Sequence, residues 1–352
     1  MEQFATMSRQ NPFISYTARA DKEPLVDILK PKRSVLEILE QNIQEVIATR
    51  EPRIVPVLGS AGAGKTSLYW TIKRLSNNGA FVVYMSPQTA ENHAEKLYTS
   101  LWYAWLSQEK GMDVLRDLAE QIEDQFGSLD EFISKLPGLP AVVAEALFAF
   151  NNDKNPDIQQ TAKFLFGGIQ TNNPILPNNK QSFLEDDELC FTALKLVLKY
   201  VDKPVIFYFD EIESLFVNYG EIPEVRLLEK IKRLYNECEN VLIIVSSLPN
   251  IWERILKLST VSAVSRFESP SVLKRFTLDD ITNLVEEYMG KYWTINNLDS
   301  IHFPSKIWPF EEEELKHIQQ ASDGNPRETI KNLRVLWTQH TELISKFLSS
   351  KL

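Results

Sequence analysis

Cysteine and histidine are scarce in this sequence of 352 residues. There are two cysteines and four histidines, and no two histidines lie four positions apart. Two cysteines cannot build a disulfide framework, and neither they nor the histidines have the spacing of a zinc site. These shortages exclude a disulfide-stapled secreted domain and a structural metal centre, and they favour a reducing, intracellular compartment.

Long apolar runs are missing as well. Residues 136–150 form the most apolar stretch, but they contain two prolines and Glu145 and fall short of the roughly 20 residues that span a bilayer. The first 11 residues have no apolar segment of the kind that a signal peptide requires. We therefore expect a cytoplasmic protein with no membrane partner.

Positive charge is not in excess. The chain has 38 Lys and Arg residues against 48 Asp and Glu residues, a net charge of −10 at pH 7. A protein that simply coats nucleic acid would carry the opposite sign. Basic residues do cluster locally, and a helical cluster of this kind either follows a phosphate backbone or is simply solvated. The clusters are Lys73 and Arg74, then Lys230, Lys232 and Arg233, then Lys274 and Arg275.

Strand-like and helical segments alternate along the chain. Apolar runs at residues 54–58, 80–85, 205–209 and 241–245 have the character of buried parallel strands, and helical periodicity lies between them. This alternation predicts an α/β fold with a doubly wound parallel sheet flanked by helices. The strand-like runs stop after Phe276, which predicts a small all-helical C-terminal domain. The expected parts are an N-terminal extension (1–30) that wraps the next domain, an α/β domain (31–275) with a helical insertion at about 90–180, and a helical lid domain (276–352).

A phosphate-binding loop follows the first predicted strand. Residues 59–66 match G-x-x-x-x-G-K-[ST] in full, and a helical pattern begins directly afterwards. Backbone N–H groups of such a loop surround the β-phosphate of ATP, while Lys65 neutralises the β- and γ-phosphates and the Thr66 hydroxyl ligates Mg²⁺. The expected nucleotide-binding residues are Gly59, Ser60, Ala61, Gly62, Ala63, Gly64, Lys65, Thr66 and Ser67.

Two acids end the apolar run at residues 205–209. Asp210 is expected to hold Mg²⁺, and Glu211 to orient and activate the attacking water. An apolar run followed by two acids is by itself often only a strand that ends in a solvated turn. Together with the phosphate-binding loop it predicts ATP hydrolysis, because a small-molecule kinase would use a substrate hydroxyl as the nucleophile in place of water.

Another strand with a polar end and three arginines complete the predicted site. The strand at 241–245 ends at two serines, of which Ser247 is expected near the γ-phosphate; an ordinary loop is the alternative. Arg266 is expected to reach the γ-phosphate of a neighbouring subunit, with Arg254 as a competitor. Arg327 follows a proline at the start of a helix, where the positive helix end attracts phosphate.

These elements together resemble the AAA+ superfamily of P-loop ATPases. The order is phosphate-binding loop, Asp-Glu strand, polar-ended strand, arginine and a helical lid with Gly-Asn-Pro-Arg at residues 324–327. The lid motif is most similar to the origin-recognition and cell-division-cycle initiators, with transposition-regulator and STAND-type archaeal ATPases as relatives. The resemblance implies the sensor-1 role for Ser247, the finger role for Arg266 and the sensor-2 role for Arg327.

Two departures from that family stand out. Lys65 and Asp210 are 145 positions apart, which exceeds what a compact AAA+ core needs and suggests a helical insertion. Aromatic residues of the insertion form either a surface for a protein partner or, more simply, part of its core; they are Tyr98, Trp102, Tyr103 and Trp105, beside Leu106. The replication initiators also carry a C-terminal winged-helix domain, for which residues 276–352 leave no room, and this favours the transposition-regulator or defence-type relatives.

The sequence thus predicts an enzyme, an ATPase with ATP and Mg²⁺ as its cofactors. Its nucleotide state would control assembly of a homo-oligomer on or beside DNA, with DNA or a DNA-bound protein as the partner. One alternative is a STAND-like signalling or remodelling switch that acts on a protein bound at the insertion. Another is a nucleotide-binding scaffold without turnover, which the presence of Glu211 disfavours.

Overall fold

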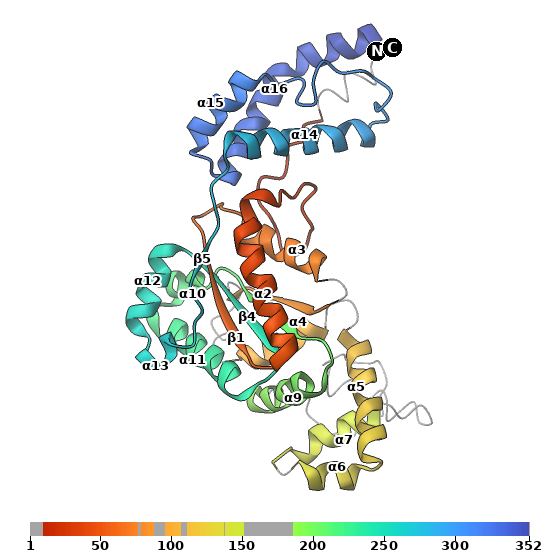
Figure 1. Ribbon diagram of the computed structural model, residues 1–352, viewed down its shortest axis with the longest axis vertical. Coiled ribbons are helices and arrows are strands. Elements are labelled where there is room, and N and C mark those ends of the chain that lie inside the picture. Colours follow the sequence, from red (N-terminus) through yellow and green to blue (C-terminus); the bar gives the residue numbers. More distant parts are fainter. Residues whose placement is uncertain are drawn as a thin grey trace.

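The computed structural model describes residues 10–76, 79–87, 96–106, 111–136, 138–150 and 186–351 (Figure 1). Along the long axis of Figure 1, the lid helices lie at one end, the sheet in the middle and the insertion helices at the other end. The predicted fold class is confirmed: a parallel sheet flanked by helices, with a helical insertion and an all-helical C-terminal lid.

Five parallel strands form the sheet. They are β1 (Arg53–Leu58), β2 (Phe81–Met85), β3 (Val205–Phe209), β4 (Val241–Ser247) and β5 (Ser271–Val272), in the order β2-β3-β4-β1-β5. β4, the strand that ends in serines, pairs with β1 on one side and with β3 on the other. Because the strands are parallel, the carboxyl ends of β1, β3 and β4 meet at one edge of the sheet.

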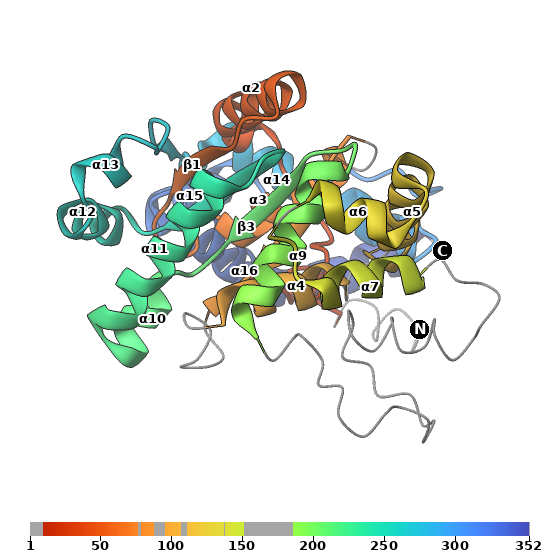
Figure 2. The same ribbon diagram turned by 90° about the horizontal axis from the view of Figure 1, so that it is seen from below.

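Helices cover both faces of this sheet, and alternate strand residues point to opposite faces. On one face α2 (Arg33–Thr49) and α3 (Lys65–Leu75) pack against residues such as Val55 and Val57. On the other face α9 (Asp187–Tyr200) and α11 (Glu221–Glu237) pack against residues such as Ile54 and Phe207. Figure 2 shows α2 on one side of the strands and α4 and α9 on the other. The remaining helices of this layer are α10 (Glu213–Tyr219), α12 (Pro249–Leu258) and α13 (Val261–Val264).

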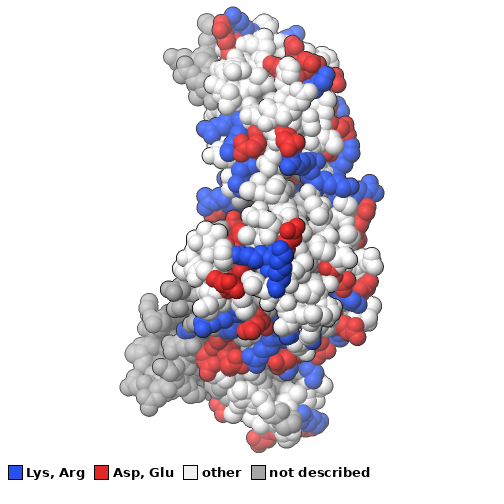
Figure 3. Space-filling model, turned by 90° about the vertical axis from the view of Figure 1, so that its left-hand side faces the viewer, with Lys and Arg blue, Asp and Glu red and all other residues white. Residues whose placement is uncertain are grey.

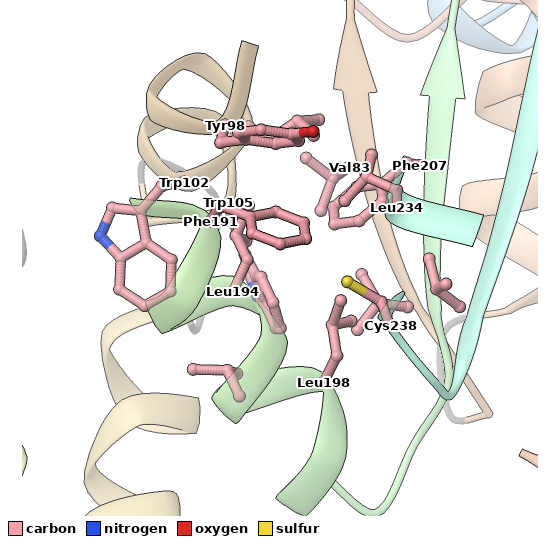
Figure 4. Close-up of a cluster of buried hydrophobic side chains, with 14 of the residues drawn as sticks. Val83, Tyr98, Trp102, Trp105, Phe191, Leu194, Leu198, Phe207, Leu234 and Cys238 are labelled. Atoms are coloured by element: carbon pink, nitrogen blue, oxygen red, sulfur yellow. The ribbon is translucent and has the colours of Figure 1, made fainter. Parts of the chain in front are cut away.

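The predicted insertion is helical where the structure describes it. It contains α4 (Leu97–Leu106), α5 (Gly111–Phe126), α6 (Leu129–Lys135) and α7 (Ala141–Phe150), whereas residues 151–185 lie outside the described part. Tyr98, Trp102 and Trp105 are buried against α9 and the sheet (Figure 4), while Tyr103 is 60% exposed. The aromatic cluster is therefore mainly core, which was the simpler of the two predicted alternatives.

The lid has a hydrophobic core of its own. It consists of α14 (Leu278–Ile295), α15 (Glu312–Ser322) and α16 (Pro326–Lys351). Thr277 begins α14 with a capping box: its side chain accepts from the Asp280 backbone N–H, and Asp280 Oδ2 accepts from the Thr277 N–H at 2.8 Å. Within the described ranges, no helix is both long and apolar enough to cross a bilayer.

The N-terminal segment (residues 10–32) contacts both the lid and the sheet domain. Phe13 and Val26 are buried in the lid core, and Asn11 donates to the Arg334 carbonyl at 2.8 Å. At its other end, the short helix η1 (Lys30–Lys32) leads into α2, and Lys32 is buried beside α3. The segment was predicted to wrap the domain that follows it, but half of its anchoring lies in the lid, because Phe13 and Val26 find their apolar partners there.

Candidate nucleotide-binding site

The loop between β1 and α3 has the conformation that phosphate binding requires. Gly62 and Gly64 have positive φ angles of 79° and 95°, which only glycine adopts without strain. The loop starts where the Gly59 N–H donates to the Ser247 carbonyl at 3.1 Å. It ends at Gly64, the residue that precedes the first turn of α3. The loop and the first turn of the helix that follows it are therefore the kind of backbone arrangement whose N–H groups bind phosphate.

Lys65 and Thr66 point from this helix start toward different parts of the site. The Lys65 ammonium donates to the Gly59 carbonyl at 3.0 Å, so its charge lies over the loop. The Thr66 hydroxyl donates to Asp210 Oδ2 at 2.6 Å. The loop and the acidic end of β3, 144 residues apart, are thus brought into direct contact.

Asp210 is fully buried and surrounded by hydroxyl groups. Oδ2 accepts from Thr66 and, at 3.1 Å, from the Tyr84 hydroxyl, while Oδ1 accepts from the Ser246 hydroxyl at 2.8 Å. A buried carboxylate needs such partners, because an unpaired one is costly. The serine beside Asp210 is Ser246; the hydroxyl of the expected Ser247 donates instead to the Leu248 carbonyl at 3.3 Å.

These oxygens suit the Mg²⁺ ion that the loop implies. The Thr66 hydroxyl and the Asp210 carboxylate are hard ligands held next to each other, and Mg²⁺ in nucleotide sites takes one or two such groups beside phosphate and water. Among the described residues no cluster of three His, Cys, Asp or Glu side chains is found, and this ion does not need one.

Glu211 follows Asp210 in a left-handed backbone conformation with φ of 56°. Burial, together with the nearby charges of Asp210 and Glu213, raises the pKa of its carboxyl, against the opposing charge of Lys65. The Ser86 hydroxyl, just beyond β2, is 3.5 Å from Glu211 Oε2. Glu213 also has a pKa raised by burial, and within the described chain its buried Oε2 has no hydrogen-bond partner.

The lid contacts the loop through the predicted Gly-Asn-Pro-Arg motif. The Asn325 side-chain amide donates to the Ala61 carbonyl at 2.8 Å, and the Arg327 N–H donates to the Gly62 carbonyl at 3.3 Å. A Cβ atom on Gly62 would lie 2.7 Å from Arg327 Cβ. The start of α16 therefore rests directly on the phosphate-binding loop.

The two candidate finger arginines have their own partners within the chain. Arg266 Nε donates to Asn236 Oδ1 at 2.7 Å, and its Nη1 donates to Ser262. Arg254 Nη2 is 2.5 Å from Glu224 Oε1, and its guanidinium lies 3.3 Å above the Phe216 ring centre. Arg254 is thus committed to a buried carboxylate, whereas Arg266 is held at the surface by neutral groups.

The basic clusters are largely paired with acids. Lys230 contacts Asp187, and Arg233 contacts both Glu188 and Glu237. Arg74 contacts Asp27, and Arg275 contacts Asp323. The face in Figure 3 accordingly carries both signs of charge side by side. The solvated, ion-paired alternative fits these residues better than a stripe that follows a phosphate backbone.

Three hydroxyl groups of the site were not among the predicted site residues: the sequence offered Ser246 but favoured Ser247, and it gave no sign of the two tyrosines. They belong to Ser246, to Tyr84, one residue before the end of β2, and to Tyr208, which donates to the Lys65 carbonyl at 2.6 Å. The available signal was position: each lies at the carboxyl end of a strand next to a loop or acid already recognised. Which of them point toward the site depends on strand register, and that required the structure.

Comparisons with known proteins show only a similarity in how the helices and strands are arranged. No family model and no curated protein matches the chain. The Aeropyrum pernix ORC1 protein in complex with DNA gives a TM-score of 0.47 at 14% identity, covering 90% of this chain and 62% of that one. The Aeropyrum pernix ORC2 protein in ADPNP–ADP complexes gives 0.46 at 12% identity, covering 90% and 64%. The chain thus spans less than two thirds of either protein.

Proposed function

We propose that this chain is an AAA+-type ATPase that binds ATP with Mg²⁺, hydrolyses it and uses its nucleotide state to control assembly on or beside DNA. The observation that carries the proposal is the contact between the Thr66 hydroxyl and Asp210 Oδ2 at 2.6 Å. It joins a complete phosphate-binding loop to an acidic strand end, and Glu211 stands directly beside it.

Each residue of the site has its own role in the proposed binding and hydrolysis of ATP. The loop N–H groups and Lys65 bind the phosphates, and Thr66 with Asp210 would hold Mg²⁺, which neutralises phosphate charge when bound. Glu211 orients the attacking water and accepts its proton, and its raised pKa makes it a stronger base than an exposed glutamate. Arg327 begins the lid helix that rests on the loop, so it senses the phosphates from that side.

The surface position of Arg266 supports the proposal of assembly. Its partners, Ser262 and Asn236, are neutral and easily exchanged for a phosphate. In a homo-oligomer, Arg266 would reach the nucleotide of the neighbouring copy and stabilise the charge on the transferring phosphoryl group. Arg266→Ala should then lower both turnover and ATP-dependent self-association, and unchanged values for both would contradict this role.

The decisive experiment is steady-state ATP hydrolysis with and without single- and double-stranded DNA. Glu211→Gln serves as the control and should reduce turnover by about 10²- to 10⁴-fold. Stimulation by DNA that falls as salt rises would support assembly on a phosphate backbone. If the wild type and Glu211→Gln hydrolyse ATP at the same rate, the proposed activity is wrong.

An exposed apolar surface favours a second candidate, an ATPase switch that acts on a protein. It lies on α10 and the start of α11, directly after the catalytic acids, and consists of Phe216, Val217, Tyr219 and Ile222, with exposed fractions from 38% to 74%. A protein bound there would lie beside Glu211, in contrast to the partner site expected at the insertion. Turnover that ignores DNA but changes in Val217→Glu and Ile222→Glu variants would select this alternative.

A further inference from the structure

Two tyrosines on neighbouring strands lie under the nucleotide site. Tyr84 on β2 and Tyr208 on β3 are register partners in the sheet. Their rings are stacked, with centroids 6.2 Å apart and an interplanar angle of 13°. Tyr208 is fully buried, and Tyr69 of α3 packs against both rings at 4.9 and 5.9 Å.

The hydroxyl groups of these two tyrosines form hydrogen bonds with different parts of the site. Tyr208 donates to the Lys65 carbonyl at 2.6 Å, in the first turn of the helix that follows the phosphate-binding loop. Tyr84 donates to Asp210 Oδ2 at 3.1 Å. The pair therefore connects the loop helix to the acidic strand end through two rigid rings that rest on each other.

Packing alone does not account for these hydroxyls. Phenylalanine would fill nearly the same volume between α3 and the sheet. Burial raises the pKa of both phenols above the usual range. Tyr69, in the same cluster, makes no hydrogen bond through its hydroxyl within the described residues.

Asp210 shows what the Tyr84 hydroxyl adds. Thr66 and Tyr84 both donate to Oδ2. A threonine hydroxyl that ligates a metal ion through its oxygen can still donate its O–H to the carboxylate, and Tyr84 is a second, independent donor that reaches Oδ2 from the neighbouring strand. Tyr84 thus fixes the orientation of Oδ2 whether or not Thr66 is engaged with an ion.

We propose that Tyr84 and Tyr208 are positioning residues: Tyr84 orients Asp210 toward the metal ion, and Tyr208 orients the loop helix toward the nucleotide. The proposal rests on the nucleotide site of the proposed function. Tyr84 and Tyr208 occupy equivalent positions in the sheet but have different proposed roles. Nucleotide and metal binding can distinguish these roles without a measurement of turnover.

The experiment compares Tyr84→Phe, Tyr208→Phe and Tyr69→Phe. Binding of a fluorescent ATP analogue is titrated in EDTA and at increasing Mg²⁺, and Mn²⁺ bound with the nucleotide is observed by electron paramagnetic resonance. Tyr84→Phe should raise the metal concentration for half-maximal binding by about tenfold and leave affinity in EDTA unchanged. Tyr208→Phe should weaken binding by about 3- to 10-fold equally in EDTA and in Mg²⁺. Tyr69→Phe should match the wild type in both.

Thermal melting of the nucleotide-free proteins separates positioning from folding. The proposal is overturned if Tyr84→Phe has the metal dependence and the Mn²⁺ spectrum of Tyr69→Phe, or if Tyr84→Phe and Tyr208→Phe change both titrations by the same factor. A wild type that binds Mn²⁺ and nucleotide without hydrolysing ATP would contradict the ATPase and leave this inference standing. A wild type that binds no nucleotide would overturn both.

Discussion

Glu211 has an uncommon backbone conformation and a carboxyl group with a raised pKa. Both follow from its position at the edge of the sheet. A φ of 56° is uncommon for a residue with a side chain. Strained conformations of this kind occur where a side chain must be aimed, and here the carboxyl is placed beside Asp210 and Lys65. The site therefore holds an acid whose charge is disfavoured by its surroundings but needed for the proposed hydrolysis.

The first prediction concerns pH. Because the folded-state pKa of Glu211 is raised, hydrolysis should lose activity on the acid side at a pH above the ordinary glutamate value of 4.5. The same shift destabilises the fold once the carboxyl is ionised. Glu211→Gln should therefore melt about 1–2 °C higher at pH 7, and this gain should shrink as pH falls through the raised folded-state pKa and be gone at the unfolded-state pKa. Calorimetry from pH 4 to 8 checks it, and a variant less stable at pH 7 would contradict it.

The second prediction separates the two serines at the end of β4. Ser246→Ala removes a 2.8 Å hydrogen bond to Asp210, whereas Ser247→Ala removes a weak one to a neighbouring carbonyl. Turnover should fall by about tenfold in Ser246→Ala and by much less in Ser247→Ala. Single-turnover hydrolysis measures the difference, and the reverse order would restore the role expected for Ser247.

At the scale of elements, the lid helix packs closely against the phosphate-binding loop. Gly62 has a φ of 79°, and a Cβ there would lie 2.8 Å from Asn325 Oδ1 and 2.7 Å from Arg327 Cβ. An alanine would strain the loop and push the start of α16 away. Asn325→Ala removes one lid contact, and with it the side-chain oxygen that accepts from the Arg327 and Glu328 N–H groups, without altering the loop itself.

The third prediction is that Gly62→Ala weakens ATP binding by at least about tenfold and increases hydrogen exchange at the start of α16. Asn325→Ala should produce the second effect with a smaller change in affinity. Gly79→Ala is the matched control, because a Cβ there meets no atom within 4 Å. Exchange at α16 that stays unchanged in both variants would show that the lid does not depend on these contacts.

Much of this element-scale picture is predictable from the sequence. The loop, the acid pair, the strand runs and the Gly-Asn-Pro-Arg helix start are local patterns, in which a few adjacent residues determine the conformation. Ser247 was preferred to Ser246, and Tyr84 and Tyr208 were not found, because strand residues alternate between faces and a one-position difference reverses the direction of a side chain. The lid anchoring of Phe13 likewise depends on contacts far apart in sequence, which periodicity does not reveal.

At the scale of the whole molecule, a buried polar cluster ties the N-terminal segment to α3. Lys32 contacts Asp27, and both side chains are almost fully buried, at 8% and 2% exposure. Lys32 also donates to the hydroxyls of Ser67 and Thr71 at 2.8 and 2.9 Å. Burial disfavours the Asp27 charge, but Lys32, Thr71 and Arg74 outweigh it and hold the pKa of Asp27 below its usual range.

The fourth prediction follows from that pair. Asp27→Ala leaves Lys32 buried without its counter-charge and should cost about 3–5 kcal/mol of unfolding free energy. Since the folded-state pKa of Asp27 is depressed, this contribution is present above the unfolded-state pKa and is lost as pH falls through the folded value. Asp21→Ala, which breaks an exposed pair with Arg19, should cost almost nothing. Urea unfolding at pH 7 and pH 3 tests both, and equal costs for the two variants would contradict the prediction.

The lid is joined to the sheet domain by two passages of chain instead of one. The first runs from Val26 in the lid core to Lys32 beside α3, and the second from β5 to the capped start of α14 (Figure 1). A lid attached by a single connection could rotate in every direction, whereas a second connection restricts its rotation. The two connections therefore limit how the lid can turn away from the phosphate-binding loop.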